Sequence, residues 1–232
     1  MKDSMAMVNS PRTYIPAAGR DIFLPFYDVI TRLLGADNAR AALIEQAHLR
    51  ANDRVLDVGC GTGTLITLLK RRQPEVEVVG LDPDPKALAR ARRKAERAAV
   101  SIRFNQGVAD ALEYPSASYD VVFSSFMFHH LEGNAKERAL AEILRVLKPG
   151  GSLFMLDFEQ PRSGAGNWLS RLLHTHDRLK DNSEERILML ITHAGFADAQ
   201  KVGERAVMFG LGRAGYYRAC ARISAVIDSP AL

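Results

Sequence analysis

The 232-residue sequence predicts an α/β fold, with a mostly parallel sheet that is covered by helices on both faces. Two observations predict it. From Arg54 onward, short apolar segments alternate with segments of helical periodicity, as expected of parallel βαβ units with right-handed crossovers. The first apolar segment also runs into a glycine-rich turn that opens a helix. The length and an apolar fraction of 47% fit one domain with a sizeable core and some accessory helices.

Residues 1–50 precede the alternating pattern and predict N-terminal cap helices. The first twenty residues carry Pro and Gly and predict irregular structure. A second helix is predicted over Asn38–His48, with Asp37 as its cap. The first helix is predicted from apolar residues at helical spacing, namely Phe23, Phe26, Tyr27, Ile30, Leu33 and Leu34.

Residues 51–232 are predicted to form the main domain. Its strands are predicted at RVLDVG, EVEVVGLD, SIRFNQG, SYDVVFSSF and SLFMLDF. Helices are predicted between them at TLITLLKRR, PKALARARRKAER and NAKERALAEILRVLK. The sequence KPGG at Lys148–Gly151 predicts a stop before the strand SLFMLDF.

The alternation breaks after Asp157. An amphipathic helix is predicted over Asn167–Leu179, inside an inserted, lid-like segment at about residues 159–182. A helix over Glu184–His193 is closed by Gly195. The end of the chain, AQKVGERAVMFGLGRAGYYRAC, resembles an antiparallel hairpin.

The net charge of +4 is concentrated partly in the sequence ARARRKAER. Two interpretations are open: a solvated helix face, favoured by Ala and Leu at helical spacing on the other side, or an RNA-binding patch. Aromatic residues do not interleave with these charges, so we expect no nucleic-acid partner. No apolar segment approaches the length of a membrane span, and the N-terminus lacks the apolar region of a signal peptide.

The two cysteines, Cys60 and Cys220, form no C-x-x-C pair, so we expect no disulfide framework and no metal site. Cytoplasmic localisation is the simplest expectation. His174 and His176 have poor spacing for a metal pair on a helix, where ligands are four residues apart.

The strongest chemical signal is the sequence VLDVGCGTG, which contains Gly59, Gly61 and Gly63. Glycines there let the backbone turn tightly and let a ligand approach it. Asp82 stands nineteen residues beyond Gly63, at the end of the next predicted strand, where a carboxylate can accept hydrogen bonds from both ribose hydroxyls. The alternative is that the glycines serve only a tight turn and that Asp82 caps the following helix.

The spacing G-x-G-x-G also favours one adenosine cofactor over another. A dinucleotide loop has a third glycine in the pattern G-x-G-x-x-G, which this sequence lacks. Asp57, two residues before the first glycine, is unfavourable near phosphates. S-adenosylmethionine has no phosphate and carries a cationic amine and a sulfonium, which suit an acidic rim.

These motifs resemble the class I S-adenosylmethionine-dependent methyltransferases, and most closely the small-molecule branch that includes the ubiquinone and menaquinone biosynthesis enzymes. The resemblance covers about Arg54–Phe158. It rests on VLDVGCGTG, VVGLDPDPKAL, SYDVVFSSFMFHHL and EILRVLKPGGSLFMLDF in that order. It implies a Rossmann-like, seven-stranded sheet whose last strand is antiparallel.

The resemblance also implies which residues bind the cofactor. Asp57 and the backbone of Gly59, Cys60, Gly61 and Gly63 surround the methionine end, and Asp82 binds the ribose. Pro83 lies beside the adenine, and Ser124 in the fourth-strand motif joins the set. The family reads Gly-Asp-Ala after the third strand, whereas this sequence reads Gly107-Val108-Ala109-Asp110. Either Asp110 replaces the missing acid, or the backbone of Val108 and Ala109 recognises adenine.

Catalysis of methyl transfer depends mainly on positioning donor and acceptor in line, since the cofactor carries the activated carbon. His129 and His130 follow the fourth strand and are the candidates for a general base. Because adjacent residues on a helix diverge, we expect one of them to face the cavity.

A small-molecule acceptor is expected, bound in an apolar pocket. Aromatic residues that can line this pocket or contact the sulfonium, or else belong to the core, are Tyr27, Phe126, Phe128 and Trp168. A cofactor-binding protein without activity and a nicotinamide oxidoreductase are the alternatives. The sequence does not indicate an oligomeric state.

Overall fold

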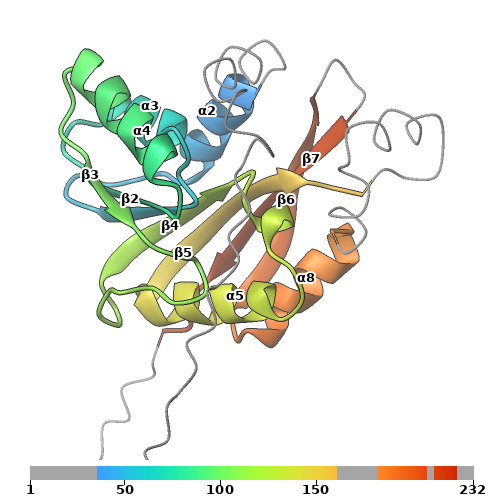
Figure 1. Cartoon of the computed structure of the whole chain (residues 1–232). Helices are drawn as coiled ribbons and strands as arrows, with labels where there is room; N and C mark the ends of the chain where they lie inside the picture. The colour runs from blue at the N-terminus through green and yellow to red at the C-terminus, as the bar shows by residue number, and fades with distance from the viewer. Residues whose placement is uncertain (1–35, 161–181, 208–211, 224–232) are drawn as a thin grey trace, which may run out of the picture.

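The computed structural model describes residues 36–160, 182–207 and 212–223 (Figure 1). Seven strands form one sheet in the order β3-β2-β1-β4-β5-β7-β6. The strands are β1 (Arg54–Val58), β2 (Glu77–Asp82), β3 (Arg103–Gln106), β4 (Tyr119–Ser125), β5 (Leu147–Phe158), β6 (Ala197–Val207) and β7 (Gly212–Cys220). The helices are α2 (Ala36–Gln46), α3 (Thr64–Arg72), α4 (Pro85–Arg97), α5 (Ala135–Val146) and α8 (Glu184–His193), with a 3-10 turn η2 (Phe128–His130).

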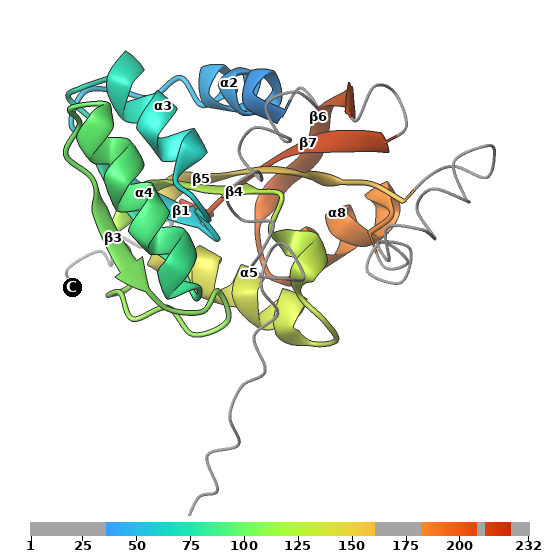
Figure 2. The same cartoon turned by 45° about the horizontal axis from the view of Figure 1, so that its top comes forward.

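Helices cover both faces of the sheet, as the sequence predicts. Helices α2, α3 and α4 lie on one face, and α5 and α8 lie on the other (Figures 1 and 2). Each face has its own core. The first packs residues such as Leu43, Leu65 and Leu88 against the sheet, and the second packs Leu140 and Ile187. Because helices cover both faces of the sheet, β1 and β4 are buried along almost their whole length.

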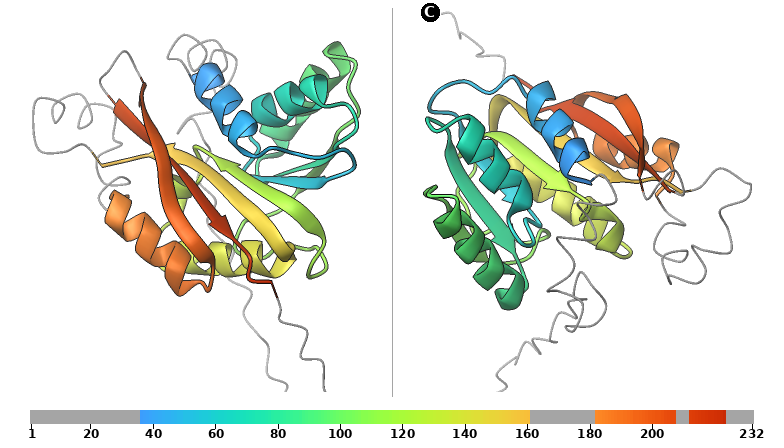
Figure 3. Two further views of the ribbon diagram at one scale, coloured as in Figure 1. Left: turned by 180° about the vertical axis from the view of Figure 1, so that it is seen from behind. Right: turned by 90° about the horizontal axis from the view of Figure 1, so that it is seen from above.

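Strands β1 to β5 are parallel, and the C-terminal hairpin completes the sheet. Strand β7 runs antiparallel to β5 on one side and to β6 on the other, so β6 is the edge strand (Figure 3). The predicted α/β class, the seven strands and the antiparallel last strand are therefore confirmed. The order of strands reverses between β1 and β4, and in open α/β sheets such a reversal is where ligands bind.

Two local predictions need correction. Helix α2 begins at Ala36, so Asp37 lies in its first turn and contacts Arg40 rather than capping the helix. The sequence KPGG lies inside β5 rather than before it. There the pairing with β4 shifts in register between Tyr119 and Val121, and Ala221 bonds to Gly151, so the glycines form an irregular part of the strand.

Several predicted features lie outside the described residues. These are the first cap helix, including Tyr27, and the helix Asn167–Leu179, including Trp168. The boundaries of the cap and of the inserted segment stay predictions. Of that segment the structure describes its two ends, where Gln160 donates a backbone hydrogen bond to Asn182 and the Asn182 side chain bonds to the carbonyl of Phe158.

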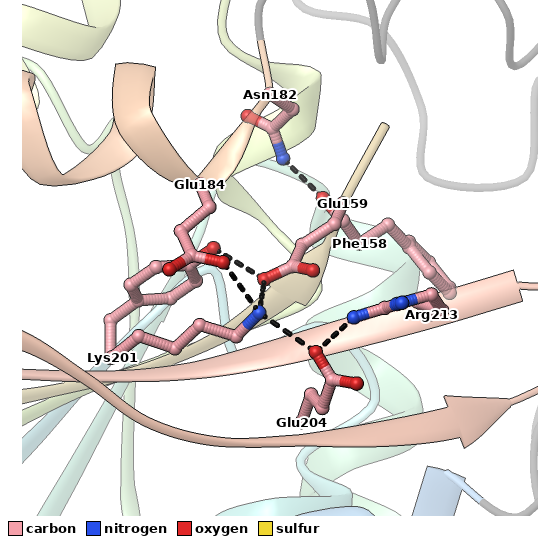
Figure 4. A network of polar contacts seen from close by, with 8 residues as sticks. Phe158, Glu159, Asn182, Glu184, Lys201, Glu204 and Arg213 are labelled. Atoms are coloured by element: carbon pink, nitrogen blue, oxygen red, sulfur yellow. Dashed lines mark hydrogen bonds and ion pairs between the residues drawn. The ribbon is translucent and has the colours of Figure 1, made fainter. Parts of the chain in front are cut away.

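An ion network centred on Lys201 ties the end of β5 to α8 and the hairpin (Figure 4). The side chain of Lys201 is 11% exposed, and its amine contacts Glu159 at 2.7 Å, Glu184 at 2.9 Å and Glu204 at 3.0 Å. Tyr217 donates to the same oxygen of Glu159, also at 2.7 Å. Burial lowers the pKa of the Lys201 amine, but its hydrogen bonds to the three carboxylates outweigh this effect and raise the pKa above its usual value.

We expect Lys201→Met to lower the free energy of unfolding by about 2–4 kcal/mol at pH 7, because it leaves three carboxylates without their shared cation. Urea denaturation measures this. The matched control is Lys148→Met, which removes an ion pair with Asp120. The Lys148 side chain is 38% exposed, so this variant should lose less than about 1 kcal/mol of the free energy of unfolding. The Lys201→Met loss should shrink at pH 4, as the carboxylates take up protons; equal losses in both variants would contradict the role of Lys201.

Candidate active site

The glycine loop joins β1 to α3 through backbone conformations that favour glycine. Gly59, Gly61 and Gly63 all have positive φ, at 75°, 52° and 73°. A Cβ on Gly59 would lie 2.1 Å from the Met127 side chain, whereas a Cβ on Gly61 would meet nothing within 4 Å. Gly59 is therefore required for packing as well as for its turn, while Gly61 faces open space.

Asp82 at the end of β2 holds this loop in place. Its carboxylate accepts hydrogen bonds from the backbone of Gly61 at 2.8 Å and of Asp84 at 2.9 Å. Asp84, not Asp82, caps α4, by accepting from the backbone of Lys86 at 2.8 Å. Each oxygen of Asp82 has a second lone pair for a ligand hydroxyl. Burial raises the pKa of Asp82.

A cavity of about 440 Å³ opens at the carboxyl ends of β1, β2, β3 and β4. Ten of the residues proposed from the sequence border it: Gly59, Cys60, Gly61, Asp82, Pro83, Val108, Ala109, Asp110, Phe126 and His130. Five others that the structure describes do not border it: Asp57, Gly63, Ser124, Phe128 and His129. Gly63 instead packs against Ala91 of α4.

Asp57 lies directly behind the glycine loop with its carboxylate unsatisfied. The side chain is fully buried, and neither oxygen accepts a hydrogen bond from any described residue. The hydroxyl of Ser124, on the neighbouring strand β4, is also buried without such a partner. Burial raises the pKa of Asp57 to about 7, with Arg40 opposing this rise and Asp82 adding to it. A buried carboxylate of this kind is favourable only beside a cation or a donor.

Arg40 supplies part of that positive charge and was not predicted from the sequence. It borders the cavity, is 7% exposed and lies 5.3 Å from the centre of the Phe126 ring. The available signal was a lone arginine on the face of α2 that buries Ala36 and Leu43. A buried cation on an apolar helix face needs a counter-charge.

The two adjacent histidines have different surroundings. His130 borders the cavity. His129 points into the core, where its Nδ1 lies 2.6 Å from Oδ1 of Asp157, a carboxylate that also accepts the backbone N–H of His129. The two imidazole rings lie against each other, with their centres 4.0 Å apart and their planes tilted by 38°. Asp157 thus fixes the orientation of His129, which in turn supports the ring of His130.

The aromatic candidates divide between cavity and core. Phe126 borders the cavity, has a positive φ of 55° and packs against Phe158 with ring centres 4.8 Å apart. Phe128 is 1% exposed and belongs to the core beside α5, with the Lys136 amine 5.2 Å from its ring centre. No group of three potential metal ligands occurs among the described residues.

The residues around the cavity fit a cofactor with a cationic end and a ribose. A cation near the glycine loop would supply the partner that Asp57 lacks, and Asp82 can accept from hydroxyls beside Gly61. The open space at Gly61 admits a ligand against the backbone. A phosphate at the same place would be repelled by Asp57 and Asp82 once they are ionised.

Because burial raises the pKa of Asp57, we expect this residue to destabilise the ligand-free protein as the pH rises. The pKa of Asp57 is higher in the folded protein than the ordinary value of an aspartate, so the folded state binds this proton more tightly than the unfolded state does. The contribution of Asp57 to the free energy of unfolding therefore falls as the pH rises from about 4 to about 7. Asp57→Asn should make the ligand-free protein more stable at pH 8, by up to about 4 kcal/mol.

Urea denaturation between pH 4.5 and 8.5 measures this effect. Asp120→Asn is the control, and its effect on stability at pH 8 should have the opposite sign. Burial raises the pKa of Asp120, but hydrogen bonds from Lys148 and the Arg54 backbone outweigh it and lower the pKa, so this variant should lose stability at pH 8. Coincident pH profiles for the wild type and Asp57→Asn would contradict the account of Asp57.

Comparisons with known proteins agree with this geometry. Residues 55–151 match a family profile described as a methyltransferase domain. A demethylmenaquinone methyltransferase of Thermus thermophilus is 44% identical over 144 residues, which are 61% of this chain and 64% of that protein. A ubiquinone/menaquinone biosynthesis C-methyltransferase of Dinoroseobacter shibae is 37% identical over 139 residues, which are 58% of this chain and 55% of that protein.

Solved structures show the same fold. A phosphoethanolamine N-methyltransferase of Haemonchus contortus, in complex with phosphomonomethylethanolamine and S-adenosylhomocysteine, superposes with a TM-score of 0.75 at 16% identity, over 89% of this chain and 58% of that one. The chain spans less than two thirds of the length of both curated relatives. The resemblance drawn from the motifs is confirmed over that part of the chain: residues 55–151 match a methyltransferase domain, and the sheet has the fold of this solved methyltransferase.

Proposed function

We propose that this protein binds S-adenosylmethionine in the cavity and transfers its methyl group to a small-molecule acceptor. The observation that carries the proposal is the buried Asp57, which accepts no hydrogen bond from the described residues and lies behind a glycine loop that Asp82 holds in place. The cationic methionine end of this cofactor would satisfy Asp57, and the ribose would bind Asp82. A nicotinamide dinucleotide lacks such a cation in its pyrophosphate, and no observation favours it.

The names of the relatives support an acceptor of the quinol class. One relative is named for demethylmenaquinone and another for C-methylation in ubiquinone and menaquinone biosynthesis. The acceptor side of the cavity, near Phe126, Met127 and Leu131, is largely apolar, as a fused aromatic ring requires. We therefore favour methylation of a ring carbon of a demethylated quinol.

None of the described helices is long and apolar enough to cross a bilayer. Absence of a nucleic-acid partner and a cytoplasmic location stay predictions.

His130 is the base candidate that the geometry favours over His129. The bound cofactor supplies an activated methyl group for displacement. His130 borders the cavity and can accept the hydroxyl proton of a quinol, which makes the ring carbon more nucleophilic. His129 is the weaker candidate for the base, because it does not border the cavity and its Nδ1 is hydrogen-bonded to Asp157 inside the core. Phe126 and Arg40 lie together in the cavity wall.

The cofactor assignment predicts the effect of Asp82→Asn. The variant should bind S-adenosylhomocysteine at least about tenfold more weakly, because a charged acceptor for the ribose hydroxyls is lost. Calorimetry measures this, with NAD expected to give no heat of binding. Asp84→Asn is the matched control, since asparagine also caps helices and Asp84 does not border the cavity. Tight NAD binding without a response to S-adenosylhomocysteine would overturn the proposal.

The base assignment predicts that His130→Gln lowers kcat for a demethylated quinol at least about tenfold at pH 7 and flattens the acid limb of the pH profile. The dissociation constant of S-adenosylhomocysteine should change little. Transfer of a deuterated methyl group, followed by mass spectrometry of the product, measures both turnover and the site of methylation. An unaltered pH profile would show that positioning alone carries the reaction, and absence of any methylated product in the wild type would favour a binding protein without activity.

A further inference from the structure

The helices on the two faces of the sheet carry very different charge. Helices α3 and α4 together have nine basic residues and one acidic residue, Glu96. Helices α5 and α8 on the opposite face have four basic and four acidic residues. Because α3 and α4 lie next to each other (Figures 2 and 3), one side of the protein is strongly cationic.

Three arginines of α4 form a stripe along its outer side. Arg90, Arg93 and Arg97 are spaced three and four residues apart, so their side chains leave the helix in similar directions. Arg93 and Arg97 are exposed, and Arg90 is partly exposed. The other side of the helix packs into the core through Ala87, Leu88, Ala91 and Ala95. The stripe therefore faces away from the sheet.

The stripe has no counter-charge within the part of the chain that the structure describes. No carboxylate there forms an ion pair with Arg90, Arg93 or Arg97, whereas Arg72 at the end of α3 pairs with Glu45. The last turn of a helix favours cations, which accounts for Arg97 but not for Arg90 or Arg93. Like charges at this spacing destabilise a helix. An anionic surface outside the protein would offset their repulsion.

We propose that the cationic face, defined by Arg71 of α3 and the three arginines of the stripe, binds the anionic headgroups of a lipid bilayer. Arg71 is exposed in the last turn of α3. Clusters of about four or more basic residues on a helical surface are typical of proteins that bind anionic lipids. A nucleic acid is the less favoured polyanion, because α3 and α4 contain no aromatic residue on which a base could stack.

The cationic face adjoins the cavity. Thr64 of α3 and Ala87 of α4 border the cavity, and the Lys94 amine donates to the hydroxyls of Thr62 and Thr64 in its wall. An apolar acceptor of the proposed class partitions into a bilayer, so docking through this face would bring the cavity close to the source of the acceptor. This step rests on the proposed function, whereas the argument from charge does not.

Co-sedimentation of the full chain with vesicles, without cofactor or acceptor, tests the inference. One set of vesicles contains equal amounts of phosphatidylcholine and phosphatidylglycerol, and the other contains phosphatidylcholine alone. We expect binding to the anionic vesicles at low ionic strength and none to the neutral vesicles. Binding should be lost at about 1 M salt, where the screening length falls to about 3 Å.

The triple variant Arg90→Gln/Arg93→Gln/Arg97→Gln should bind the anionic vesicles at least about thirtyfold more weakly, since each basic residue near the surface contributes about fivefold in affinity. The matched control removes the same charge from exposed arginines outside α3 and α4, and it should bind like the wild type. This control is Arg186→Gln/Arg218→Gln/Arg222→Gln. Thermal unfolding verifies that each variant is folded. If the triple variant is not, Arg93→Gln alone decides, with an expected loss of about fivefold.

Failure of the wild type to bind the anionic vesicles at low ionic strength would overturn the inference. An equal loss in the two triple variants would also overturn it, because the binding would then depend on net charge rather than on this face. Single-stranded RNA that binds more tightly than the anionic vesicles, and displaces them, would assign the face to a nucleic acid instead. Vesicle binding by a protein that does not bind S-adenosylhomocysteine would support the inference and refute the proposed function.

Discussion

The arrangement of this protein depends on a carboxylate that the fold buries and does not satisfy. Asp57 is the penultimate residue of β1, next to the point where the strand order reverses. None of the described residues donates a hydrogen bond to its oxygens. Such a group costs stability in the ligand-free protein, by roughly 1–3 kcal/mol or more. A cationic ligand that enters the cavity would offset this cost, so the same residue that weakens the empty fold would strengthen the complex.

The rest of the structure holds that site rigidly. Two separate cores pack helices on both faces of the sheet, which fixes the carboxyl ends of β1, β2, β3 and β4 relative to one another. Asp82 ties the glycine loop to the end of β2, and Gly59 allows Met127 to pack against it. Behind His130, the pair of His129 and Asp157 anchors the 3-10 turn to β5. Positioning is what methyl transfer most requires of a protein.

The sequence predicted those parts of the site that lie within contiguous motifs. The glycine loop, Asp82 and the histidine pair follow strands whose apolar pattern is clear, so their place at one edge of the sheet followed from the fold class. Arg40 and Arg138 were not predicted, because they reach the cavity from helices and only tertiary packing brings them there. The KPGG sequence was misplaced because irregular pairing can continue a strand through turn residues.

Proton release on ligand binding tests the role of Asp57 most directly. The pKa of Asp57 is raised to about 7 in the ligand-free protein, and a bound ammonium group would lower it. Calorimetric titration with S-adenosylhomocysteine at pH 7, in buffers of different ionisation enthalpy, measures the protons exchanged. We expect the wild type to release about half a proton more than Asp57→Asn. Equal proton release by the two proteins, with both binding the ligand, would contradict it.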